Sequence, residues 1–219
     1  LGIVETTIAI HYVFNSPVDK IVYDVSHQCY PHKILTGRKE CFTNCDEYYK
    51  YSGFTAPEES CHDIFKVGHT STSVSLALGV AKARDLKSEK GNVIALIGDG
   101  SLSGGEAYEG FNNASCLNGN LIIVVNDNDM SIAENQGGLY QNLKLLRETN
   151  GKAELNFFKS LGFDYVYTDD GNNIQKMIDV FKKVKDINHP VVVHVKTQKG
   201  HGLKCAEINK EMFHWILPK

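Results

Sequence analysis

Two short polar motifs follow two apolar runs, and their residue types suit the binding of a hard cation and of phosphates. Gly98-Asp99-Gly100 comes after the apolar run 93–97, and Asn126-Asp127-Asn128 comes after the run 121–125. Each run is long enough for one buried strand, and the stretch between the two runs is typical of a helix. Both motifs should therefore lie at the carboxyl ends of neighbouring parallel strands, where open α/β sheets bind ligands.

The oxygen atoms of these motifs can hold a divalent cation. Mg²⁺ prefers octahedral coordination by oxygen, and a diphosphate can supply some of the ligands. The Asp99 carboxylate and the Asn128 amide would supply two more, and a backbone carbonyl just beyond them, that of Met130, another. A helix expected to begin near Ser103 would point its N-terminus at the anion. Together the two motifs favour a magnesium–diphosphate site over a pair of ordinary turns.

Two further polar segments follow expected strands. Gly68–Ser73 comes after the expected strand 64–67 and opens a helix, with backbone donors, an N-cap hydroxyl and the His69 imidazole. These groups favour phosphate contact over a plainly capped helix start. His27–Lys33 follows the expected strand 21–24 and carries two histidines and a lysine, which fit an anion or substrate site better than a solvated loop.

The strands and helices that would position these residues alternate along the chain. The expected helices cover residues 4–14, 71–86, 103–115, 139–147, 153–161 and 174–184, and the expected strands cover 21–24, 64–67, 93–97, 121–126, 165–167 and 191–195. Residues 28–60 show no clear period and indicate a long loop with one short helix, and such loops are usually functional. The pattern predicts one α/β domain over residues 1–219, with a mostly parallel sheet flanked by helices on both faces.

Composition narrows the class of protein. With 42% hydrophobic residues, 22% charged residues and a net charge of −3, the chain gives no reason to expect a nucleic-acid or anionic-membrane partner. No apolar run approaches the ~20 residues of a membrane span, and no signal peptide is visible. Its six cysteines form no CxxC pair, so reduced thiols in the cytoplasm are expected rather than a zinc site.

Several stretches resemble the 1-deoxy-D-xylulose-5-phosphate synthase family. Asp24–Arg38 is similar to its DVGHQAYPHKILTGR segment, Gly68–Ser73 to its GHSSTS, and Asn126–Ile132 to its NDNxMSI. Lys199–Gly202 and Phe213-His214 are similar to its KGxG and FH elements. The HQxYPHKILTGR string is far more specific than the GDG and NDN motifs, which form the thiamine-diphosphate signature shared with transketolases.

The resemblance implies a thiamine-diphosphate-binding domain of the diphosphate type and a set of site residues. The cofactor would contact His27, Gly68, His69, Thr70, Gly100, Ser101 and Asn128. Asp99, Asn128 and the Met130 carbonyl would bind Mg²⁺, and His214 would face the substrate as the catalytic residue.

The reaction implied by the resemblance joins pyruvate and D-glyceraldehyde 3-phosphate to 1-deoxy-D-xylulose 5-phosphate with loss of CO₂. This is the first step of the non-mevalonate isoprenoid pathway and a supply for thiamine biosynthesis, and the family context implies a cytoplasmic homodimer. Two alternatives stay open. One is transketolase-type transfer of a ketol unit with the same cofactor, and the other is a non-catalytic cofactor-binding subunit or fragment that needs a partner chain.

The chain also departs from the family pattern. Ser26 replaces a glycine before His27, Leu203 stands where many members have a tyrosine near the cofactor, and the segment 132–161 looks short. The chain starts at Leu1 without the family's SGH element and stops before the pyrimidine-binding domain, which carries the activating glutamate. It therefore resembles the first domain of the enzyme trimmed at both ends, and activity is not expected from it alone.

Overall fold

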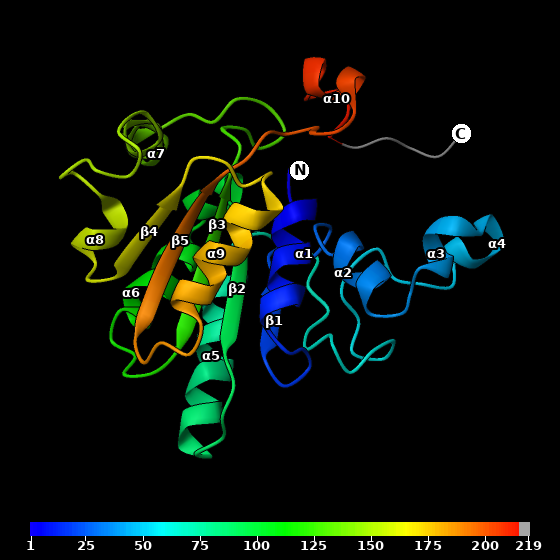
Figure 1. The fold of residues 1–219 in the computed structure, drawn as a ribbon, viewed down its shortest axis with the longest axis horizontal. Helices are drawn as coiled ribbons and strands as arrows, with labels where there is room; N and C mark the ends of the chain where they lie inside the picture. Colours follow the sequence, from blue (N-terminus) through cyan, green and yellow to red (C-terminus); the bar gives the residue numbers. More distant parts are fainter. Residues whose placement is uncertain (215–219) are drawn as a thin grey trace.

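Five parallel strands form the centre of the computed structural model, which describes residues 1–214 (Figure 1). They are β1 (Lys20–Tyr23), β2 (Val93–Gly98), β3 (Leu121–Asp127), β4 (Asp164–Thr168) and β5 (Pro190–Lys196). The order across the sheet is β1-β2-β3-β5-β4, and each neighbouring pair is parallel. Every residue of β3 is buried, as expected for a central strand that helices cover on both sides.

Ten α-helices and one 3₁₀ helix accompany the sheet within the described residues 1–214. They are α1 (Val4–Val13), α2 (Tyr30–Leu35), α3 (Glu40–Thr43), α4 (Cys45–Tyr48), α5 (Ser73–Leu86), the 3₁₀ helix η1 (Asp99–Ser103), α6 (Gly105–Ala114), α7 (Gly138–Glu148), α8 (Phe157–Ser160), α9 (Ile174–Val184) and α10 (Lys204–Ile208). Helices α1 and α9 pack on one face, and α5, α6, α7 and α8 pack on the other. The expected α/β class with a parallel sheet and two helical layers is confirmed.

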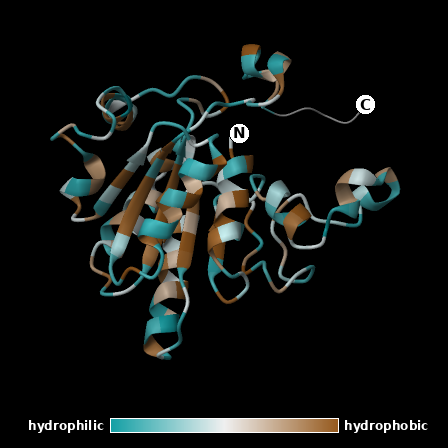
Figure 2. Cartoon of the chain, viewed as in Figure 1, coloured by the Kyte–Doolittle hydropathy of each residue, from teal (hydrophilic) through white to brown (hydrophobic). Residues whose placement is uncertain are grey.

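Alternation along the strands divides the core into two apolar layers. In β2, Ile94 and Leu96 face α1 and α9, while Ala95 and Ile97 face the layer of α5 and α6. Figure 2 shows the apolar strands at the centre and hydrophilic residues along the outward sides of the helices. The carboxyl ends of the strands lie on the same side of the molecule as the N-terminus and α10, whereas α2, α3 and α4 lie beyond the β1 edge (Figure 1).

Three of the expected elements differ from the observed ones. The helix expected over 153–161 is only α8, because the Asn156 side chain caps a helix start at Phe157 by accepting from the backbone N–H groups of Phe158 and Lys159. Residues 64–67 form no strand, because the Phe65 and Val67 carbonyls accept hydrogen bonds from the side chains of Thr55 (2.6 Å) and Ser26 (2.6 Å) instead of pairing with β1. The apolar side chains of Ile64 and Phe65 pack against the core without entering the sheet. Residues 28–60 contain three short helices rather than one.

Within residues 1–214, no helix combines the length and the apolar character that crossing a membrane requires.

Candidate cofactor and metal site

A cleft of about 680 Å³ lies at the carboxyl ends of β1, β2 and β3. The parallel register places Gly98 of β2 beside Asn126 of β3, so the two motifs become neighbours across the strands. The cleft brings together nearly all of the predicted site residues: His27, Gly68, Thr70, Asp99, Gly100, Ser101, Asn128, Met130 and His214. His69 is the exception, because its exposed ring turns to the Thr70 carbonyl, with Nδ1 at 2.7 Å from that oxygen.

Asp99 is a buried carboxyl group at the base of the cleft. Its side chain is held by Asn135, whose Nδ2 donates to Oδ2 at 2.8 Å, and the residue is 2% exposed. Burial, together with the negative charge of Asp127, raises the pKa of Asp99 to about 8. No lysine or arginine among residues 1–214 forms an ion pair with this carboxyl group, and a bound cation would compensate its charge.

Asn128 presents an amide oxygen with no partner. Its Nδ2 donates to the Leu1 carbonyl at 3.2 Å, and the Nδ2 of Asn126 donates to the same carbonyl at 3.0 Å. This orients the amide, and its buried Oδ1 finds no hydrogen-bond partner within the described part of the chain. A buried acceptor without a partner costs about 1–3 kcal/mol, so it needs an explanation. A carboxylate and an amide oxygen suit Mg²⁺, and these residues therefore fit the predicted metal.

Gly100 lets the loop after β2 approach the loop after β3. A Cβ atom on Gly100 would lie 2.6 Å from the Cβ of Ser131, which is closer than side chains tolerate. The Tyr140 hydroxyl also donates to the Gly100 carbonyl at 3.3 Å. Only glycine allows this close approach, which brings Met130 and Asp99 to one cleft.

The start of α5 is held by Asp24 rather than by a hydroxyl of its own. The carboxylate of Asp24, at the end of β1, accepts from the backbone N–H groups of Ser71 (2.9 Å) and Ser73 (3.0 Å). No side chain of the segment caps the helix, so the predicted N-cap hydroxyl is wrong. An aspartate directly after the β1 strand was the one sequence signal for this role.

His27 and His214 lie near each other in the cleft, with ring centroids 6.1 Å apart. Burial, followed by the positive charges of Lys199 and His27, lowers the pKa of His214 to about 4. Burial also lowers the pKa of His27. Both rings are therefore neutral near pH 7, and Nδ1 of His214 has no hydrogen-bond partner among the described residues.

His32 and Lys33 do not share this cleft, contrary to the hypothesis of an anion or substrate site. Both side chains are fully buried, where His32 Nε2 lies 2.8 Å from Asp63 Oδ1 and Lys33 Nζ lies 2.7 Å from Glu59 Oε2. Arg38 donates to both oxygens of Asp63 as well. These residues of the HQxYPHKILTGR string join the loop beyond β1 to the rest of the domain.

We expect Asp63→Asn to lower the free energy of unfolding by about 3–5 kcal/mol, because removing the Asp63 charge leaves the buried Arg38 with only its longer contact to Glu59, at 3.4 Å. Burial opposes ionisation of Asp63, but hydrogen bonds from His32 and Arg38 outweigh it and lower its pKa. The ionised Asp63 therefore contributes to the free energy of unfolding at pH 7, and this contribution is lost as the pH falls below 3.8, the ordinary pKa of an aspartate. Urea unfolding at pH 7 and at low pH measures both effects.

The matched control for this experiment is Glu58→Gln. Glu58 pairs with Lys66 at 2.8 Å, but both side chains are more than half exposed. Its urea midpoint should equal that of the wild type. Equal midpoints for Asp63→Asn and the wild type at pH 7 would contradict the structural role of the buried pair.

Two of the departures from the family pattern, Ser26 and Leu203, have different structural settings. Ser26 has a φ of +35°, a backbone conformation that favours glycine, and its buried hydroxyl donates to the Val67 carbonyl and lies 3.0 Å from the Thr55 hydroxyl. Leu203 is 54% exposed and precedes α10, outside the lining of the cleft.

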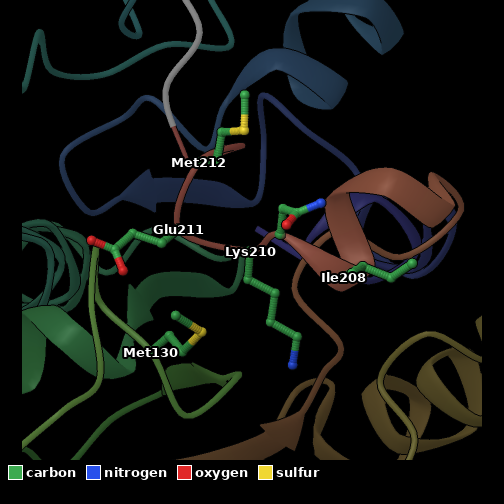
Figure 3. Close-up of a pocket in the computed structure, with 6 residues that line it drawn as sticks. Met130, Ile208, Lys210, Glu211 and Met212 are labelled. Carbon is green, nitrogen blue, oxygen red and sulfur yellow. The ribbon is translucent and has the colours of Figure 1, made fainter.

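A second groove of about 600 Å³ adjoins the cleft through Met130. It is lined by α10 and the segment after it, and Figure 3 shows Lys210 and Glu211 beside the Met130 side chain. Ile208 and Met212 in this groove are more than two-thirds exposed.

Two solved structures of mutant transketolases from Pichia stipitis superpose on 92% of the chain and 32% of their own, with TM-scores of 0.71 and 0.70 at 22% and 20% identity. The fold is thus that of the transketolase class. The family model for 1-deoxy-D-xylulose-5-phosphate synthase matches residues 1–156 and 147–197, and the chain belongs to this family.

Individual relatives agree with this assignment. The 1-deoxy-D-xylulose-5-phosphate synthase of Carboxydothermus hydrogenoformans is 46% identical over 252 aligned positions, which cover 99% of this chain and 40% of the relative. That of Caldanaerobacter subterraneus subsp. tengcongensis is 43% identical, covering 100% of this chain and 41% of its own. The chain therefore spans about 40% of the length of these relatives.

Proposed function

We propose that this chain forms the diphosphate- and metal-binding half of an enzyme that makes 1-deoxy-D-xylulose 5-phosphate from pyruvate and D-glyceraldehyde 3-phosphate. The observation that carries the proposal is that Asp99 and Asn128 lie at adjacent strand ends in one cleft, where the Oδ1 of Asn128 has no partner within residues 1–214. Family membership supports the choice of reaction. We also propose that the enzyme is a cytoplasmic homodimer and that it binds both substrates as free small molecules.

Each part of the cleft has a role in this proposal. Asp99, Asn128 and the Met130 carbonyl would hold Mg²⁺, and backbone donors of Gly68, Thr70, Gly100 and Ser101 would bind the diphosphate. Thiamine diphosphate supplies an electron sink for the loss of CO₂ from pyruvate.

The two neutral imidazoles of the cleft would act on the reacting end of the ligands. His214 can accept or return a proton at Nδ1, which has no hydrogen-bond partner in the described part of the chain, and His27 lies next to it. Burial keeps both rings neutral, which is the state that can accept a proton near pH 7.

The test uses the native polypeptide that carries this chain, supplied with Mg²⁺ and thiamine diphosphate. We expect CO₂ release from pyruvate only when D-glyceraldehyde 3-phosphate is present, together with an equal amount of 1-deoxy-D-xylulose 5-phosphate. Ketol transfer from a ketose phosphate without CO₂ would instead establish transketolase chemistry. Absence of both reactions with intact cofactor binding would establish a non-catalytic subunit.

The 219-residue chain alone is expected to form no product. Generating the reactive carbanion needs a carboxylic acid at the pyrimidine end of the cofactor, and Asp99 is the only carboxyl group among the described residues that line the cleft. Glu106 and Glu109 lie exposed on α6 instead. The measurement is product formation by the purified chain with both substrates, and the full-length Carboxydothermus hydrogenoformans relative serves as the positive control. Steady turnover by the chain alone would contradict the prediction.

A further inference from the structure

Arg147, on α7, contacts the residues on either side of Asn128 from the face of the sheet that α7 covers. Its Nη1 lies 2.8 and 2.7 Å from the two carboxylate oxygens of Asp127, and its Nη2 bonds Oδ1 of Asp129. The Arg147 side chain is 10% exposed, and that of Asp127 is fully buried. One guanidinium therefore holds the residues on either side of Asn128.

The Asp127 carboxylate has further partners that fix its position. It accepts from the backbone N–H of Asp129 at 3.0 Å, and His194 Nε2 lies 2.8 Å from its Oδ2. The Tyr165 hydroxyl lies 2.7 Å from Nδ1 of the same histidine. Both ring nitrogens of His194 therefore have a partner. Arg147, Asp127, His194 and Tyr165 thus form one continuous series of hydrogen-bonded side chains.

These hydrogen bonds affect the position of Asn128 because they fix the residues before and after it. Successive side chains of a strand point to opposite faces, so Asp127 faces α7 while Asn126 and Asn128 face the Leu1 carbonyl. Asp129 then takes a left-handed conformation with a φ of +64°. A non-glycine residue adopts this conformation only when its surroundings stabilise it, and the bonds from Arg147 and Asp127 do so.

Arg147 acts on this loop from outside the cleft. Asp99 and Asp127 are two buried carboxyl groups at adjacent strand ends. Arg147 pairs with Asp127 at 2.7 Å, and it does not line the cleft that Asp99 and Asn128 line. Its bonds therefore hold the residues beside Asn128 and leave the cleft free for a cation.

We propose that Arg147 is a positioning residue for the metal site: it sets the affinity for the divalent cation by holding Asp127 and Asp129 on either side of Asn128. This inference rests on the proposed function, because it takes Asp99, Asn128 and Met130 as the cation ligands. Groups behind metal ligands typically change metal affinity by about 10–100-fold when they are removed.

The experiment measures Mn²⁺ binding by electron paramagnetic resonance, with thiamine diphosphate present, in the native polypeptide. We expect Arg147→Met to raise the Kd for Mn²⁺ by about tenfold or more. Arg147→Lys keeps the charge but loses the contact with two carboxylates, and its Kd should lie between those of the wild type and Arg147→Met. Tyr165→Phe should raise the Kd by a smaller factor.

Arg84→Met is the matched control. Arg84 is equally buried, at 9% exposure, and pairs with Asp85 and the Gly91 carbonyl at the opposite end of the sheet. Urea unfolding of all variants separates lost stability from lost affinity. We expect Arg84→Met to lose stability but keep the Kd of the wild type.

The outcomes distinguish failure of the proposed function from failure of the proposed role of Arg147. A wild type that binds no Mn²⁺ overturns the proposed function itself. A wild type that binds Mn²⁺, with Arg147→Lys and Tyr165→Phe unchanged in Kd, overturns the role of Arg147 even if Arg147→Met fails to fold. An equal rise in Kd for Arg84→Met would make the effect one of general destabilisation and overturn it as well.

Discussion

Asp99→Ala is expected to weaken the joint binding of Mg²⁺ and thiamine diphosphate about 5- to 150-fold or more in the native polypeptide, which corresponds to about 1–3 kcal/mol. The physical reason is the loss of a charged ligand from a site whose remaining side-chain oxygen, Oδ1 of Asn128, is neutral. Titration calorimetry with both ligands measures the change. Wild-type affinity in Asp99→Ala would show that the metal assignment is wrong.

Asp99→Asn should separate this role from a structural one. Because folding raises the pKa of Asp99 to about 8, ionising this group at neutral pH opposes folding. The amide keeps an acceptor for Asn135 Nδ2 and removes the repulsion with Asp127. We therefore expect an unfolding midpoint in urea equal to or above that of the wild type, together with weak cation binding.

Asp19→Asn is the matched control for this substitution. Asp19 is also buried, but it lies at the opposite end of the sheet, where it accepts from the backbone N–H groups of Asn15 (2.7 Å) and Asn92 (2.6 Å). Its replacement should lower the urea midpoint and leave the affinity for Mg²⁺ unchanged. We thus expect Asp99→Asn to lose cation affinity without losing stability, and Asp19→Asn to lose stability without losing cation affinity.

His214→Ala is expected to lower kcat by about 10²–10⁴-fold in the native polypeptide, while the cofactor Kd changes little. The ring is kept neutral by burial and by the nearby charge of Lys199, and its Nδ1 is without a partner among the described residues. These properties suit a group that exchanges a proton with the substrate. Steady-state kinetics and cofactor titration of the same variant measure the two effects.

His189→Ala is the control for a histidine substitution as such. His189 is exposed and pairs with Asp164 at the amino end of the β4 and β5 strands, far from the cleft. It should keep the kcat of the wild type. An unchanged kcat with weakened cofactor binding in His214→Ala would instead identify His214 as a cofactor or packing residue.

The sequence alone was sufficient for the fold class and for most of the cleft. The apolar runs before Asp99 and Asn126 are local signals of buried strands, and a motif directly after a buried strand lies at its carboxyl end in any parallel sheet. The placement of Asp99 and Asn128 in one cleft therefore follows from local patterns. The chemical roles of these residues stay predictions until the experiments above are done.

Side-chain partners far apart in sequence were decided only by the tertiary structure. His32 and Lys33 have the same local signature as His27, but Asp63 and Glu59 hold them inside the domain. Residues 64–67 have the apolar character of a strand, yet side-chain hydroxyls satisfy two of their carbonyls. Neither outcome can be deduced from local periodicity, because each depends on a partner that only folding brings near.

The side chains that contact the proposed metal site are likewise placed only by the tertiary structure. Asn135 lies 36 positions from Asp99, and Arg147 lies 20 positions from Asp127, on elements whose own patterns indicate only a loop and a helix. A local apolar pattern predicts where a strand ends, and therefore where the polar residue after it lies, because strand formation and burial depend on a few neighbouring residues. The direction of that ligand and the charge around it depend on contacts across the sheet, which only the packed structure contains.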